Sequence, residues 1–80
     1  MNTYRLSNTS IATFREFLRH CGCRYVGITG GHEKWHKEGC TRCVIFQTHI
    51  DPIPEFILKS NLRTIGCTRK QFEQWLKSHS

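Results

Sequence analysis

The sequence has no long apolar run, and its hydrophobic stretches fall far short of the roughly 18–20 residues that cross a membrane. Polar and charged side chains interrupt residues 1–20, so this stretch holds no apolar run of the kind a secretion signal needs. Internal repeats, low-complexity segments and linkers are also absent. The 80 residues suffice for one domain, 1–80, in which residues 1–8 form a short polar lead-in. We therefore expect a single domain in the cytoplasm, with no membrane partner.

Acidic residues are scarce, because six Asp and Glu stand against twelve Lys and Arg and leave a net charge of +6. The positive charges are spread along the chain instead of forming a tail. This balance suits a polyanion such as nucleic acid, although solubility alone would account for it equally well. The five cysteines are an odd number, which argues against a fully paired disulfide framework in a reducing compartment.

Hydrophobic periodicity predicts a first helix that begins after Thr9 and Ser10 and runs to about Cys21. A second helix is predicted over Glu55–Ile65, followed by a short last helix that starts with a capping box at Thr68. In the connector before the second helix, Asp51 could cap that helix or favour its N-terminal dipole. Pro54 suits the first helical position.

Three segments between the first two helices alternate with a period of two and predict strands. The predicted strands are Cys23–Thr29, His32–Lys37 and Arg42–Thr48. In the first of them, Val26 and Ile28 are expected on one side and Tyr25 on the other. Short loops join the strands, so we expect a three-stranded antiparallel sheet with helices on one face. The fold class is α+β, in the order αβββα plus a short C-terminal helix.

The segment Gly30–His36 holds the most informative chemistry in the chain. On a strand that opens with His32, the side chains of His32, Lys34 and His36 share one face, while Glu33 and Trp35 share the other. Since Trp35 suits the core, the histidine face should be the uncovered one. An imidazole suits proton transfer near neutral pH, and the two glycines let a substrate backbone approach closely. An ordinary solvated hairpin would show the same spacing.

Gly30-Gly31-His32-Glu33-Lys34-Trp35 resembles the Gly-Ser/Gly-His-x-x-aromatic signature of HicA-type toxins. Thr41-Arg42-Cys43-Val44 is similar to a Thr-Arg-Pro-Val segment of the same family, with Cys43 where proline is common. The connector from His49 to Pro54 and the helix after it also fit, so the resemblance spans roughly residues 9–77. The predicted element order is that of the family's double-stranded-RNA-binding-domain-like fold.

The resemblance implies a toxin of a type II toxin-antitoxin system, an mRNA interferase that needs no metal or other cofactor. It places the family's single essential histidine on His32 and implies a HicB-type antitoxin that covers the active face. We expect His32 to take a proton from a ribose 2′-OH, so that DNA resists cleavage. The residues expected to contact RNA are Gly30, Gly31, Lys34, Lys37 and Arg42. His36 is a candidate proton donor by geometry alone.

Three alternatives remain open from the residues. His32, His36, Cys40 and Cys43 have the ligand types and number of a tetrahedral zinc site. On an extended strand, however, His32 and His36 would lie about 13 Å apart, too far to share one ion. The same fold could instead serve as a non-catalytic RNA-binding module, or as a small adaptor that binds another protein through its open sheet face.

Overall fold

Three helices and three strands make up the computed structural model, which describes residues 8–79. The elements are α1 (Ile11–His20), β1 (Arg24–Thr29), β2 (His32–His36), β3 (Val44–Gln47), α2 (Glu55–Thr64) and α3 (Arg69–Ser78). This order confirms the α+β class predicted from the sequence. Of the predicted lead-in over residues 1–8, only Asn8 lies within the described residues.

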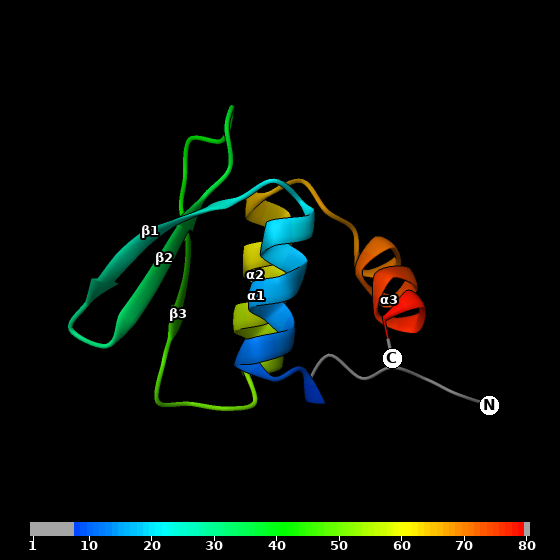
Figure 1. The fold of residues 1–80 in the computed structure, drawn as a ribbon, viewed down its shortest axis with the longest axis horizontal. Helices are drawn as coiled ribbons and strands as arrows, with labels where there is room; N and C mark the ends of the chain where they lie inside the picture. Colours follow the sequence, from blue (N-terminus) through cyan, green and yellow to red (C-terminus); the bar gives the residue numbers. More distant parts are fainter. Residues whose placement is uncertain (1–7, 80) are drawn as a thin grey trace.

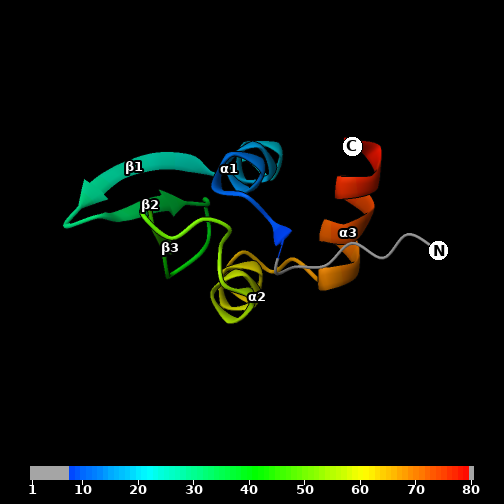
Figure 2. The ribbon, with the colours of Figure 1, turned by 90° about the horizontal axis from the view of Figure 1, so that it is seen from below.

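The three strands form one antiparallel sheet in the order β1-β2-β3, as the short loops predicted. Helices α1 and α2 lie together on one side of this sheet, and α3 packs on the far side of the two helices (Figures 1 and 2). The β1–β2 hairpin extends away from the helices toward its turn (Figure 1). One sheet face is therefore covered only in part, and the opposite face is open.

The start of α1 is capped twice. The Ser10 hydroxyl accepts a hydrogen bond from the Thr13 N–H, which confirms Ser10 as the N-cap. The Asp51 carboxylate accepts from the Ile11 N–H at 3.0 Å, and α2 has no side-chain cap, so the prediction that Asp51 caps α2 was wrong. The reason is tertiary, because the connector after β3 passes the start of α1. Pro54 is likewise the N-cap of α2 and not its first helical residue.

Strand β1 contains a bulge that overturns its predicted pattern. Tyr25 pairs with Trp35 and Ile28 pairs with Glu33, with a register shift between Tyr25 and Gly27. Tyr25 and Ile28 therefore share the helix-side face, although the sequence pattern placed them on opposite sides. A bulge adds one residue to one strand, which reverses the alternation beyond it.

The ends of several elements differ by one or two residues from the prediction. Strand β2 ends one residue early, and β3 spans only Val44–Gln47 because a bend at Thr41 and Arg42 precedes it. Helix α2 ends at Thr64, before Gly66 with its positive φ of +68°. The capping box that begins α3 at Thr68 is confirmed.

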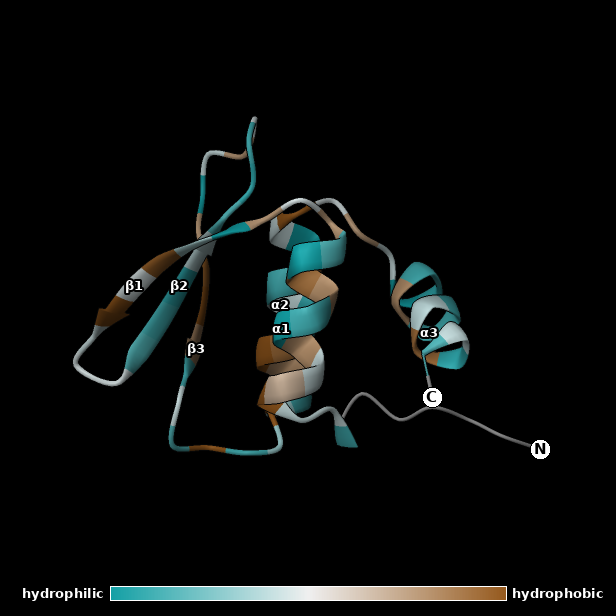
Figure 3. Cartoon of the chain, viewed as in Figure 1, coloured by the Kyte–Doolittle hydropathy of each residue, from teal (hydrophilic) through white to brown (hydrophobic). Residues whose placement is uncertain are grey.

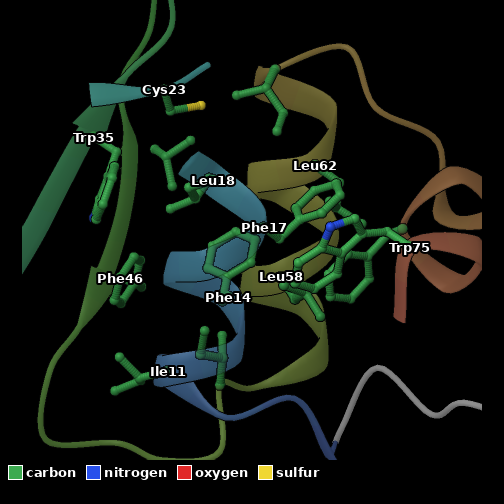
Figure 4. Close-up of a cluster of buried hydrophobic side chains, with 14 residues drawn as sticks. Ile11, Phe14, Phe17, Leu18, Cys23, Trp35, Phe46, Leu58, Leu62 and Trp75 are labelled. Atoms are coloured by element: carbon green, nitrogen blue, oxygen red, sulfur yellow. The ribbon is translucent and has the colours of Figure 1, made fainter. Parts of the chain in front are cut away.

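The core lies between the sheet and the helices and is rich in aromatic side chains. Trp35 and Phe46 face α1 from the sheet, and Trp75 of α3 approaches Phe17 from the other side (Figure 4). The Phe17 ring lies edge-on to Trp75, with 5.2 Å between the ring centroids. The other members of the cluster are Ile11, Phe14, Leu18, Cys23, Val44, Ile53, Leu58, Leu62, Ile65 and Phe72. The side chains on the helix-side face of β2 and β3 are therefore buried in the core.

One carboxylate lies inside this core face. Glu33 is only 1% exposed, and its oxygens accept from the Arg15 guanidinium at 2.6 and 3.0 Å and from the Trp35 indole N–H at 2.7 Å. Burial by itself raises the pKa of Glu33, but these hydrogen bonds outweigh it and lower the pKa below its usual value. The ionised Glu33 therefore ties β2 to α1.

We expect the replacement Glu33→Ala to lower the free energy of unfolding by roughly 2–3 kcal/mol, because it leaves the buried Trp35 N–H without an acceptor. Glu16→Ala is a matched control, since Glu16 forms only an exposed ion pair with Arg19. Urea denaturation of both variants and the wild type measures the difference. Equal stability of the two variants would contradict this role for Glu33.

Candidate functional site

His32 begins β2 directly after a two-residue turn. Gly30 and Gly31 both have positive φ, +59° and +80°, as the tight turns of β-hairpins require. His32 is exposed and pairs with Thr29 and Gln47 across the sheet, and its imidazole has no hydrogen-bond partner among residues 8–79. Its position at the start of a strand on the open face agrees with the sequence interpretation. The imidazole is free to meet a ligand.

A second histidine lies beside the same turn, and the sequence analysis missed it. His49 Nδ1 is 3.7 Å from the point that a Cβ on Gly31 would occupy. Thr48 fixes this approach, because its N–H and its hydroxyl both donate to the Gly31 carbonyl, at 2.9 and 3.2 Å. The signal that could have found His49 is the antiparallel register, which brings the end of β3 beside the start of β2.

Two of the predicted RNA-contacting cations line one hollow. Lys34 and Arg42 border a space of about 450 Å³ between the open sheet face and α2. The remaining lining residues are Cys43, Ile45, Ser60, Asn61 and Thr64. No acidic side chain lines the hollow, and neither cation has a salt bridge to a carboxylate among the described residues. The hollow therefore suits an anion.

Asn61 holds the wall of this hollow in place. Its side-chain amide donates to the Ile45 carbonyl at 2.9 Å and accepts from the Ile45 N–H at 3.2 Å. The free edge of β3 is thereby paired with α2. A buried amide in two backbone hydrogen bonds fixes the helix against the strand, so Ser60 and Thr64 border the hollow from a defined position.

Lys37, the third predicted cation, does not join the other two. Its ammonium group lies 3.5 Å from the Ile65 carbonyl, beyond the end of α2. There it borders a different hollow of about 530 Å³, which also involves Cys21, Cys67 and Trp75. The structure thus separates Lys37 from the hollow beside β2.

His36 is engaged with the loop after its own strand. Its Nε2 lies 3.0 Å from the Cys40 carbonyl, and its Nδ1 is buried without a partner in the structure. A half-buried ring held in this way is poorly placed to exchange protons with a substrate. The structure therefore does not support His36 as the proton donor.

The zinc alternative finds no geometric basis in the part of the chain described. Among residues 8–79, no three side chains of His, Cys, Asp or Glu gather closely enough to hold a metal ion. Cys40 and Cys43, the two thiols of the zinc alternative, are free and half-buried. The His36 ring is bonded to the Cys40 carbonyl, whereas His32 is exposed at the other end of β2.

We expect zinc to leave the thermal unfolding midpoint of the untagged protein unchanged to within about 1 °C, because a ligand stabilises only the fold that binds it. Differential scanning fluorimetry with and without zinc, and after treatment with a chelator, measures this. A rise in the midpoint that Cys43→Ser abolishes would instead support the zinc site.

Helices able to cross a membrane are not found among residues 8–79, where none is both long and apolar enough.

Compared with family models, with curated proteins and with solved structures, the chain shows no significant match to any of the three.

Proposed function

We propose that this protein is a metal-independent endoribonuclease that cleaves mRNA, with His32 as its catalytic residue. One observation carries the proposal: the free imidazole of His32 and an acid-free hollow lined by Lys34 and Arg42 lie on the same open sheet face. An imidazole suits proton transfer, and paired cations suit phosphate. RNA offers both a 2′-OH proton for the imidazole and an adjacent phosphate for the cations.

The distance between His32 and Lys34 on β2 suits one ribose and the phosphate next to it. His32 and Lys34 are two residues apart on one face of β2, a separation of about 7 Å. A phosphate in contact with Lys34 would thus place a neighbouring ribose within reach of His32. The two glycines of the turn carry no side chains that would keep an RNA backbone away from the imidazole.

The reaction follows from these groups. His32 takes the proton of a ribose 2′-OH, and the O2′ attacks the adjacent phosphorus. The P–O5′ bond breaks as the 5′-oxygen takes up a proton from an acid or from water, which yields a 2′,3′-cyclic phosphate and a 5′-OH end. Lys34 and Arg42 stabilise the charge that builds on the phosphoryl oxygens. Because the nucleophile is the 2′-OH, DNA is not a substrate.

The biological role we propose comes from the resemblance of Gly30–Trp35 to HicA-type toxins. In that role the protein is a cytoplasmic toxin of a type II system with a double-stranded-RNA-binding-domain-like fold, and a HicB-type antitoxin neutralises it by covering the open face. Net positive charge and a largely open sheet face are compatible with both the RNA and the antitoxin.

Recognition of an RNA duplex in the usual manner of this kind of fold has less support. Ordinary readers of double-stranded RNA carry a lysine-rich cluster at the start of the last helix of the αβββα unit. Helix α2 begins here with Glu55 and Phe56, and Phe56 is 72% exposed. Single-stranded RNA at the open face is the substrate that agrees better with the charges.

We expect His32→Ala to lower the rate of RNA cleavage by about 10²–10⁴-fold, the usual contribution of a positioned acid or base. Induced expression of the wild type should arrest growth, and induced expression of the variant should not. His36→Gln is the matched control and should cleave at close to the wild-type rate. Cleavage assays on RNA and on DNA of the same sequence complete the test.

The alternatives give other outcomes. Binding without cleavage would indicate the non-catalytic RNA-binding module. Cleavage of DNA as fast as RNA would rule out the 2′-OH mechanism, and wild-type cleavage by His32→Ala would remove His32 from the site.

We expect Lys34→Ala and Arg42→Ala each to weaken RNA binding and to reduce the slope of log K against log salt by about 1, as the loss of one phosphate contact does. Fluorescence anisotropy on the non-cleaving His32→Ala background measures this at several salt concentrations. Lys70→Ala, on the exposed side of α3, removes the same charge and should have a smaller effect. Equal effects at all three positions would show that net charge alone attracts RNA.

A further inference from the structure

The connector that carries His49 is held at both ends. Before it, Thr48 is bonded to the carbonyl of Gly31 in the β1–β2 turn. After it, Asp51 accepts from the first N–H of α1, and the Ile53 N–H donates to the Thr9 carbonyl at 2.9 Å. His49 and Ile50 are the two residues between these anchors. The backbone of His49 is thereby fixed relative to the glycine turn and His32.

The His49 imidazole is also available. The residue is exposed, and its ring has no hydrogen-bond partner among residues 8–79. The neighbouring Asp51 carboxylate has an oxygen engaged by the start of α1. Because both ring nitrogens are free and an imidazole titrates near neutral pH, the His49 side chain can give or take a proton at a position that the fixed backbone defines.

Cleavage of RNA through the 2′-OH requires two proton transfers. One group must accept the proton of the nucleophile, and another must donate a proton to the departing 5′-oxygen. His32 can perform only one of these in a single turnover step. His32 and His49 are two free imidazoles beside the same side-chain-free turn, so they could serve the two ends of one phosphodiester.

The other histidines are placed elsewhere. His36 is bonded to the Cys40 carbonyl. His20 and His79 pack against Trp75, with 6.0 and 4.3 Å between ring centroids, on the side of α3. Of the five histidines, only His32 and His49 lie at the glycine turn.

We propose that His49 is the second proton-transfer residue, which donates a proton to the 5′-oxygen while His32 accepts one from the 2′-OH. This inference rests on the proposed ribonuclease function. The P–O2′ bond forms as the P–O5′ bond breaks, and the proton that His32 gains is balanced by the proton that His49 loses. The products are a 2′,3′-cyclic phosphate and a neutral 5′-OH.

A substrate with sulfur in place of the 5′-oxygen tests this role. A thiolate leaves without being protonated, because a thiol is far more acidic than an alcohol. We expect His49→Ala to cleave an ordinary RNA oligonucleotide about 10²–10⁴-fold more slowly than the wild type. On the matching oligonucleotide with a 5′-sulfur at the cleaved linkage, the same variant should regain a rate close to wild type. His32→Ala should stay slow on both substrates.

Controls separate catalysis from folding. His49→Gln keeps a polar side chain of similar size, and it should behave like His49→Ala in both assays. Circular dichroism and thermal unfolding check that both variants are folded, and anisotropy checks that they still bind RNA. His36→Gln should show wild-type rates on both substrates.

Each remaining outcome has a definite meaning. If the wild type cleaves and depends on His32 but His49→Ala is as fast, the inference is overturned and the proposed function stands. A slow His49→Ala that the 5′-sulfur does not rescue would make His49 a structural or positioning residue and overturn the inference. Rescue of His32→Ala instead would reverse the two roles. If the wild type cleaves no RNA, the proposed function itself fails.

Discussion

The ion pair between the buried Glu33 and the partly exposed Arg15 fixes the orientation of β2, on which the rest of the site depends. Side chains alternate along a strand, so a Glu33 that points into the core forces His32 and Lys34 onto the open face. A carboxylate at 1% exposure is tolerated only because Arg15 and Trp35 satisfy it. The interaction joins α1 to the middle strand β2, and it also holds the face of β2 that carries His32 and Lys34 outward.

The open face acquires its chemistry from segments that the fold brings to it. Asn61 fastens α2 to the edge of β3, and this creates the hollow in which Lys34 and Arg42 meet. Thr48 fastens the connector to the hairpin turn and places His49 there. Hydrophobic colour on β1 marks a further exposed apolar stretch along the hairpin, where Val26 and Ile28 are each 51% exposed (Figure 3).

Local rules predicted much of this structure. Capping at Ser10 and Thr68, the two-glycine turn and the alternation of β2 depend on neighbours within a few residues, and all of them hold. The errors arose where a distant contact competes with a local pattern. The bulge in β1 changed the face of Ile28, and Asp51 met the start of α1 instead of α2. Propensity and periodicity contain no information on either contact.

The sequence by itself determined the element order, the exposed position of His32 after two glycines and the inward position of Trp35, because hydrophobic period and turn chemistry are local properties. Only the tertiary structure decided which cations share a hollow and which histidine accompanies His32. Lys37 is three residues from Lys34 yet borders another hollow, whereas His49 is seventeen residues from His32 and lies beside its turn. Proximity in space depends on strand register and on anchors between distant backbone groups, which no local pattern specifies.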